Sequence, residues 1–586
     1  MLGYPSIYHS LSFRVTTAVK IYKNNPVLEK IASLSSEPLM SASASEKGGS
    51  ESLTSDIDAQ GLEKLGYKQE LSRSRGLFHI LFMTTGGSII STLFPNHSLV
   101  IVLIVSAILA VPYGLSAPIA TSLIGGGPAT ILWGWLLVSV LTQPIALSLA
   151  EICSVYPTSA GAYYWCYRLT PARYRLVVSW INGWLYAVGI WTISLSVTFG
   201  TAQLVVAGVT IFHPNWVATP WQTYLIFIAV TVFTSIVILY LNKVLPTIDV
   251  AFWTLFGIIA ILIGFSVKAA SGRRSASFAL GHFDASSAGW TPGWAFFIGL
   301  LPVRFLAAML VALHSSTNVR PTSMSEEVRH PAIQVPQAIA YSIPIGTISG
   351  LLFLLPIVFT LPDIQTLLAV PGGQPIGVMF TLIMGSKSGG FGMWFIIFGI
   401  GLFCAISICC AASRGTWSFA RDKAIPFHHI FSRISGDASD ASLVPFNAHL
   451  LSTTIQLLLG LIYLGSSAAF NAFVGVGVIC LGASYAMPIA ILLFGKEGRK
   501  QVREAPFSLG RWGWWLNVAA FLWLSLEIVL FSMPAVIPVD RVSMNYASVV
   551  FVGFAVISAG WYFISGRYHF AGPPNPSDID NDKFSL

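Results

Sequence analysis

A proline and a glycine interrupt an apolar stretch of the chain where an unbroken helix would use every backbone hydrogen bond. Pro112 lacks a backbone N–H and clashes with the preceding helical turn, while Gly114 permits unusual dihedral angles. Two interpretations are open: a simple proline kink, or a discontinuous helix whose freed backbone groups bind a small ligand. On the second interpretation, we expect the ligand to contact Ala110, Val111, Pro112, Tyr113, Gly114 and Ser116.

Glu151 is the acidic residue best placed to carry a proton. It closes a second apolar stretch and precedes a polar segment that contains Tyr156 and Pro157. An ionisable group at the edge of a hydrocarbon layer is costly, so it is often functional. We consider two roles for Glu151. It is either an inner-gate or proton-coupling carboxylate, or an interfacial acid that pairs with a loop arginine such as Arg168.

The composition places these residues in a membrane protein. Of the 586 residues, 54% are hydrophobic and 10% are charged, whereas a soluble domain carries about 25% charged residues. This excludes cytosolic enzymes, nucleic-acid-binding proteins and secreted disulfide-rich domains. Because the apolar stretches contain no HExxH pair, GxSxG elbow or Walker loop, we expect no enzymatic activity, no catalytic residue, no cofactor or metal site and no nucleic-acid partner.

Twelve stretches are apolar enough to span a bilayer, which takes about 20 residues. They are centred on residues 99–121, 129–150, 176–209, 221–241, 248–267, 294–313, 338–361, 392–412, 447–465, 470–494, 513–535 and 546–565. Cytoplasmic loops carry an excess of Lys and Arg. With the N-terminus inside, nearly all of the 32 basic residues fall on the cytoplasmic side, which predicts that both termini are cytoplasmic.

We expect three regions along the chain. Residues 1–76 are polar and rich in serine, so they are predicted to be a disordered cytoplasmic tail. Residues 77–566 form the predicted transmembrane domain, and residues 567–586 form a short cytoplasmic tail. The apolar stretch 77–94 is predicted to be interfacial or re-entrant, because a thirteenth span would move the basic N-terminal segment outside.

Several motifs resemble those of the amino acid-polyamine-organocation (APC) superfamily, and within it the fungal permeases for amino acids, GABA and choline. They are LAEICSVYPTSAGAYYW at 149–165, Gly183-Trp184, MSEEV at 324–328, PGGQP at 371–375, Ser413-Arg414, FARDKAIP at 419–426 and SYAMPI at 484–489. The resemblance implies an all-α polytopic membrane protein of about 12 transmembrane helices. It further implies a LeuT-like core of two inverted five-helix repeats, plus two extra helices.

The resemblance also implies a function. It predicts a secondary active transporter that imports a small amine-bearing solute, such as an amino acid, GABA or choline, across a fungal plasma membrane. Protons are the expected coupling ion, and membrane lipid is the other expected partner. Helix N-termini would stabilise a substrate carboxylate, while carbonyl groups and aromatic faces would receive an ammonium group. In this scheme Glu151 would couple proton movement to transport, and residues 110–114 would form the break in the helix at the substrate site.

Two segments depart from the family pattern. Residues 84–106 look like an insertion in the first span, and residues 303–323 lack the glycine expected of an unwound stretch and place Arg304 in the sixth span. Retained intron sequence or an altered reading frame would explain both segments, and divergence towards a new substrate is the rival explanation. The second hypothesis for function is therefore a transport-incompetent chain, either a permease-like nutrient receptor or a defective isoform.

Overall fold

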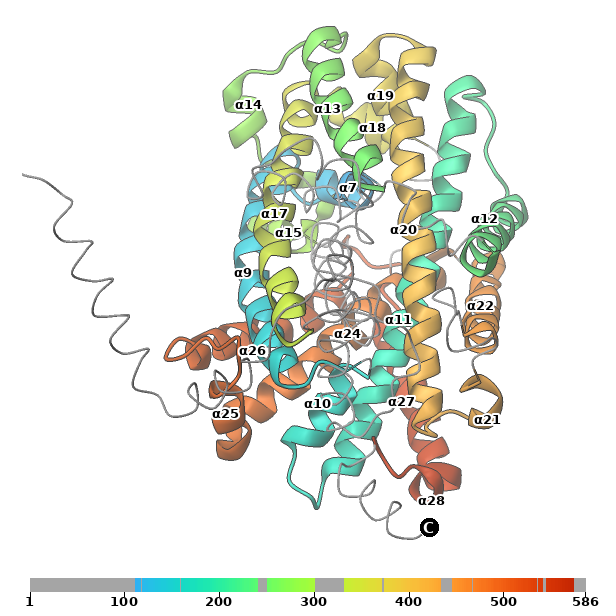
Figure 1. Cartoon of the computed structure of the whole chain (residues 1–586). Coiled ribbons are helices and arrows are strands. Elements are labelled where there is room, and N and C mark those ends of the chain that lie inside the picture. The colour runs from blue at the N-terminus through green and yellow to red at the C-terminus, as the bar shows by residue number, and fades with distance from the viewer. Residues whose placement is uncertain are drawn as a thin grey trace, which may run out of the picture. The chain divides into compact units, whose positions relative to one another are not determined.

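Helices account for nearly all regular structure in the part of the chain that the structure describes (Figure 1). The computed structural model describes residues 111–116, 119–158, 160–240, 250–300, 331–370, 374–433, 445–465, 467–534, 536–540 and 544–573. Within these ranges, pairing of the strand type is limited to an isolated bridge between Gly126 and Asp284. Helices satisfy their backbone hydrogen bonds internally, as hydrocarbon requires, and the predicted all-α fold is confirmed.

Nine helical segments in these ranges are long and apolar enough to cross a membrane, and they confirm nine of the predicted spans. The chain is therefore a multi-pass membrane protein. The nine segments are α9 (Pro128–Val155), α11 (Arg175–Phe212), α12 (Pro220–Tyr240), α17 (Pro331–Phe359), α20 (Lys387–Arg421), α22 (Phe446–Gly460) with α23 (Ile462–Gly465), α24 (Ser467–Phe494), α26 (Gly513–Phe531), and α27 (Ala547–Trp561) with η4 (Tyr562–Gly566) and α28 (Arg567–His569).

The other three predicted spans are not among these nine segments, but helices lie in each of them. α13 (Val250–Lys268) coincides with the predicted span 248–267. The first span contributes α7 (Val111–Ser116) and α8 (Ile119–Ile124), and the sixth contributes α15 (Pro292–Gly299). Several sequence-based predictions fall outside the described residues: the tail 1–76, the interfacial stretch 77–94, the apparent insertion 84–106 and the altered segment 303–323.

Two pairs of long helices form the centre of the bundle. α9 packs along α17, and α11 packs along α20. In the predicted order of spans, α9 and α17 take the second place in each set of five, and α11 and α20 take the third. Pairs of helices at equivalent places are what two inverted repeats produce. The pairing agrees with the expected core. Of the extra helices, α26 packs against α24 and α9, and α27 packs against α24 and α11.

Basic residues gather at one end of the bundle, which we call the basic end. α10 (Ala162–Leu169), α21 (His428–Phe431), α25 (Lys496–Arg503) and α28 lie at this end, and α14 (Ala276–Gly281) and α18 (Ile364–Leu368) lie at the opposite end (Figure 1). The positive-inside rule predicts that the basic end is cytoplasmic. Its basic residues include Arg168, Arg173, Arg175, Arg421, Lys423, Arg499, Lys500, Arg503 and Arg567.

The chain after α27 folds back onto α11 at the basic end. The rings of Tyr562 and Phe570 flank Trp180 of α11, with centroids 5.4 and 5.1 Å from the indole. The backbone at Gly566 lies so close to this indole that a Cβ atom there would be 2.6 Å from it. Residues 567–573, which belong to the predicted C-terminal tail, therefore pack against the helical domain.

Glycines let aromatic rings sit directly on neighbouring helices. Trp135 of α9 lies over Gly350 of α17 and donates a hydrogen bond from Nε1 to the carbonyl oxygen of Thr347 at 3.0 Å. A Cβ atom at Gly350 would lie 2.4 Å from the indole. In the second pair, Trp394 of α20 lies against Gly208 of α11 in the same way, where a Cβ atom would be 2.3 Å from the ring. Membrane helices associate through such close packing, because hydrocarbon supplies no hydrophobic driving force.

We expect Gly350→Ala to destabilise the folded protein, because its methyl group must displace the buried Trp135 ring. Overpacking of this kind costs about 1–3 kcal/mol of unfolding free energy. Gly392→Ala in α20 is the matched control, since nothing lies within 4 Å of the Cβ position there, and alanine favours a helix over glycine by about 1 kcal/mol. The midpoint of thermal unfolding in detergent measures both variants. Equal midpoints would contradict the tight packing of α9 on α17.

Candidate functional site

The residues predicted to contact a ligand lie in α7, a short buried helix. α7 packs against α13, α17 and α20, and all six of its residues are buried. Pro112 and Gly114 both have helical backbone within α7, which ends at Ser116, and α8 begins at Ile119. Residues 111–116 are thus helical, while the residues before Val111 and residues 117–118 lie outside the described ranges, so the predicted break and its ligand contacts stay predictions. Ala110 lies outside the described residues.

Tyr113 fills the space between α11 and α20. Its ring lies against Gly401 of α20, where a Cβ atom would be 2.6 Å from it, and its hydroxyl lies against Gly200 of α11. The hydroxyl donates a hydrogen bond to the carbonyl oxygen of Val197 at 3.0 Å. Both the ring and the hydroxyl are engaged with the protein, so Tyr113 anchors α7 to these two helices.

Ser116 has a different environment at the end of α7. Its side chain is 0% exposed, and its Oγ has no hydrogen-bond partner among the residues that the structure describes. Buried polar groups are nearly always hydrogen-bonded, to protein, ordered water or a ligand. Ser116 is therefore the predicted contact whose polar atom is available to a bound solute.

α8 and α15 meet through glycine. The backbones of Gly125, directly after α8, and Gly299, the last residue of α15, are so close that a Cβ atom at Gly125 would lie 2.3 Å from the Gly299 Cα. Ser122 also donates a hydrogen bond from Oγ to the Gly299 carbonyl oxygen at 2.9 Å. The structure thus brings parts of the predicted first and sixth spans together. The sequence SLIGGGP at 122–128 contains the glycines that allow this contact, but nothing in it indicates the partner.

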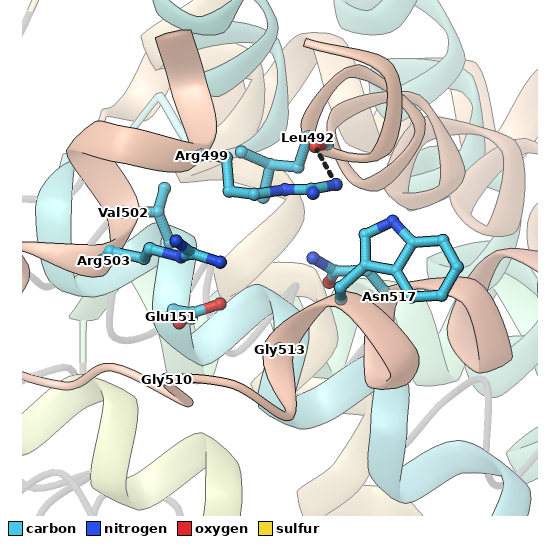
Figure 2. Close-up of a pocket in the computed structure, with 9 residues that line it drawn as sticks. Glu151, Leu492, Arg499, Val502, Arg503, Gly510, Gly513 and Asn517 are labelled. Atoms are coloured by element: carbon cyan, nitrogen blue, oxygen red, sulfur yellow. Dashed lines mark hydrogen bonds between the residues drawn. The ribbon is translucent and has the colours of Figure 1, made fainter. Parts of the chain in front are cut away.

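Glu151 lies near the basic end of α9 and binds the loop between α25 and α26. Its Oε1 accepts hydrogen bonds from the backbone N–H of Leu509 at 2.7 Å and from the hydroxyl of Ser508 at 3.2 Å. The guanidinium group of Arg503 on α25 is directed towards the carboxylate and attracts it (Figure 2). Glu151 is only 4% exposed. It therefore holds a core helix to the extra helices through one buried carboxylate.

The alternative role for Glu151 was an interfacial acid that pairs with a loop arginine such as Arg168. Arg168 is not that arginine, and Arg503 is the arginine beside Glu151. The Arg168 guanidinium lies over the ring of Tyr156, 5.7 Å from its centroid, because Arg168 sits in the last turn of α10 beside this ring. Glu151 instead faces α25 and α26. A carboxylate beside an arginine at the basic end is what the interfacial-acid interpretation predicts, and the inner-gate and proton-coupling roles stay predictions.

A second polar contact at the basic end joins the motif at 149–165 to the motif at 419–426. The sequence had indicated no role for this pair. The Tyr163 hydroxyl of α10 donates a hydrogen bond to Asp422 Oδ2, directly after α20, at 2.8 Å and lies 3.1 Å from Ser418 Oγ. Burial raises the pKa of Tyr163 well above its ordinary value, so its hydroxyl stays a donor at physiological pH. Both motifs can be recognised in the sequence, but neither predicts the contact between Tyr163 and Asp422. The hydrogen bond links α10 to the end of α20.

Comparisons with known proteins agree with this architecture. Residues 76–555 match the family model described as amino acid permease. The chain is 33% identical to the polyamine transporter TPO5 of Saccharomyces cerevisiae, over 81% of this chain and 76% of that protein. It is 31% identical to the amino-acid permease BAT1 homolog of Oryza sativa subsp. japonica, over 91% and 98% of the two chains. It is 29% identical to the choline transporter of Saccharomyces cerevisiae, over 78% and 79%.

We expect Glu151→Leu to lower the midpoint of thermal unfolding, because it leaves the Leu509 N–H and the Ser508 hydroxyl without their acceptor. A polar group left unsatisfied in a buried place costs about 1–3 kcal/mol. Glu151→Gln keeps an acceptor oxygen at the same place and removes only the charge, so its midpoint should stay closer to that of the native chain. A Glu151→Leu midpoint equal to the native one would contradict the hydrogen-bonded link between α9 and the α25–α26 loop.

Proposed function

Because the chain belongs to the amino acid permease family of the APC superfamily, we propose that it is a secondary active transporter that imports a small amine-bearing solute. The observation that carries this proposal is the family match, which covers residues 76–555 and so nearly all of the described helices. The pairing of α9 with α17 and of α11 with α20 supports it, since alternating access in such proteins moves one repeat-related group of helices against another.

The names of the relatives narrow the chemistry of the proposed solute. Polyamines, choline and amino acids all carry a positively charged nitrogen, whereas only amino acids always carry a carboxylate. We therefore propose the cationic nitrogen as the feature that the site recognises. Hydroxyl oxygens, backbone carbonyls and aromatic faces bind such groups. The buried Oγ of Ser116, which has no partner among the described residues, supports this proposal as one such acceptor.

We further propose protons as the coupling ion and the plasma membrane as the location. The fungal permeases that the motifs resemble are usually driven by protons. We propose Glu151 as the coupling residue. Its carboxylate is buried, and its cationic neighbour Arg503 is exposed to solvent, so Arg503 can move away when Glu151 is protonated. A proton on Glu151 would cancel the attraction between the two and loosen the contact of α9 with α25.

Uptake of radiolabelled solutes tests the proposed function. In cells that lack their own amino acid, polyamine and choline permeases, we expect the chain to accumulate at least one of these solutes. Absence of uptake of all three classes, with the chain verified at the cell surface, would contradict transport and favour a receptor. Ser116→Ala should raise the KM for the transported solute about tenfold, the factor for one hydrogen bond to a charged group.

Ser148→Ala is the matched control for that variant. Ser148 is also buried, but its Oγ donates a hydrogen bond to the Pro144 carbonyl oxygen of its own helix at 2.8 Å. Removing this hydroxyl should leave the KM unchanged. An equal rise in KM for both variants would show that Ser116 acts on the fold rather than on the solute.

Ion dependence of uptake tests the coupling. We expect a protonophore to abolish accumulation, external acidification to increase it, and replacement of sodium to have no effect. Glu151→Gln should remove accumulation against a gradient while leaving exchange of labelled for unlabelled solute, because the coupling proton is lost but the substrate site is not. Uptake that requires external sodium and survives the protonophore would contradict proton coupling.

A further inference from the structure

A polar pocket opens at the basic end between α9, α25 and α26. Its enclosed part has room for about one water-sized group, and the whole hollow, including the open solvent at its mouth, measures about 300 Å³. Figure 2 shows the side chains of Glu151, Arg499, Arg503 and Asn517 converging on this space. The complete lining consists of Glu151, Leu492, Arg499, Val502, Arg503, Gly510, Gly513, Trp514 and Asn517.

One wall of the pocket offers hydrogen-bond acceptors. Asn517 is 4% exposed, and its Oδ1 has no hydrogen-bond partner among the described residues. Glu151 uses Oε1 for its hydrogen bonds to the α25–α26 loop, and its Oε2 lies on the side of Gly513. A buried amide oxygen without a donor is unfavourable. The Asn517 oxygen and the Glu151 carboxylate would therefore bind a ligand that donates N–H groups and carries positive charge.

The facing wall is cationic. Arg499 is half-buried, and its Nη2 donates to the carbonyl oxygens of Leu492 at 3.2 Å and Leu493 at 3.0 Å at the end of α24. These contacts fix the guanidinium group across the pocket (Figure 2). Arg503 is exposed and projects into the same space. In Figure 2 the guanidinium groups of Arg499 and Arg503 enter the space from different sides, and Arg503 also faces Glu151. Guanidinium groups bind phosphate and carboxylate groups.

Tryptophans and basic residues place the mouth of the pocket at a membrane surface. Trp514 lines the pocket and is exposed, as are its neighbours Trp512 and Trp515. Tryptophan is enriched where a bilayer meets water. Lys500 and Arg511 are exposed beside them, and clusters of basic residues at the cytoplasmic surface attract lipid headgroups. A phospholipid headgroup can therefore reach the pocket without leaving its leaflet.

We propose that this pocket binds the headgroup of an aminophospholipid. The phosphate lies between Arg499 and Arg503, and the primary ammonium group donates to Asn517 Oδ1 and pairs with Glu151. A quaternary choline headgroup has no N–H to give to Asn517, and an anionic headgroup without an amine leaves Asn517 unpaired and faces the Glu151 carboxylate. The bound lipid joins α9 to α25 and α26. A water-soluble phosphate ester of ethanolamine carries the same two groups and is the other possible source of this chemistry.

The test compares two lipids that differ only in methylation of the headgroup nitrogen. The full-length protein is placed in nanodiscs of equimolar phosphatidylethanolamine and phosphatidylcholine with identical acyl chains, and bound lipid is counted by native mass spectrometry. We expect about a tenfold preference for phosphatidylethanolamine, the factor for one hydrogen bond to a buried acceptor. Equal binding of the two lipids, or a pocket that holds water alone, would overturn the proposal.

Variants locate the preference in the pocket. Asn517→Leu should abolish the preference, and Asn517→Asp, which keeps the acceptor oxygen, should retain it. Arg503→Gln, at an exposed position that tolerates change, should reduce the retention of both lipids. Arg511→Gln is the matched control, because this exposed arginine does not line the pocket. A preference that survives in folded Asn517→Leu or Arg503→Gln protein would refute the site.

A soluble headgroup distinguishes the two sources of the ligand. Glycerophosphoethanolamine is added to the protein in nanodiscs of phosphatidylcholine alone, and the midpoint of thermal unfolding is measured. If it raises the midpoint as much as phosphatidylethanolamine does, and not in Asn517→Leu, the pocket serves a soluble zwitterion of the same chemistry. If only the membrane-bound form raises the midpoint, the lipid is the ligand. A rise that persists in Asn517→Leu would contradict both sources.

Discussion

Close contact between aromatic rings and helix backbones holds this membrane protein together. Apolar side chains gain little by leaving a lipid solvent, so helices in a bilayer associate through dispersion forces and hydrogen bonds. Glycine supplies the necessary closeness, with Trp135 seated on Gly350 and Trp394 seated on Gly208. Each indole also donates a hydrogen bond to a backbone carbonyl of the helix on which it rests, so one residue provides both packing and register. The candidate site depends on these pairs, because α7 is held against α17 and α20.

Buried polar groups in the described part of the chain fall into two kinds, and the difference separates architecture from ligand binding. Tyr113 and Tyr163 direct their hydroxyl groups at fixed protein acceptors and thereby tie short helices to long ones. Ser116 and Asn517 carry buried oxygens that no described residue satisfies. Glu151 combines both kinds, since Oε1 is committed to the α25–α26 loop while the carboxylate also borders a pocket. A residue of this sort can transmit the occupancy of the pocket to the core.

The sequence predicted the spans well because a bilayer imposes a length and an apolar composition that are visible in any single stretch. It predicted contacts poorly, because they depend on partners hundreds of positions away. Glu151 was recognised as unusual, but its acceptor role towards Leu509 could not be read from a loop of ordinary composition. Pro112 suggested a broken helix, and the described part of that span consists of two short helices, α7 and α8, on either side of residues 117–118. A lone asparagine such as Asn517 in an apolar run gives no sign of whether its amide is satisfied.

The docking of Phe570 and Gly566 onto Trp180 sets the order in which the protein can mature during synthesis. Trp180 leaves the ribosome about 390 residues before Phe570, which at about 5–20 residues per second is a delay of roughly 20–80 s. Throughout that interval one face of α11 stands uncovered at the basic end. Residues 562–570 therefore complete a surface whose other part was synthesised about 390 residues earlier, and a nascent chain released before them would expose that face of α11.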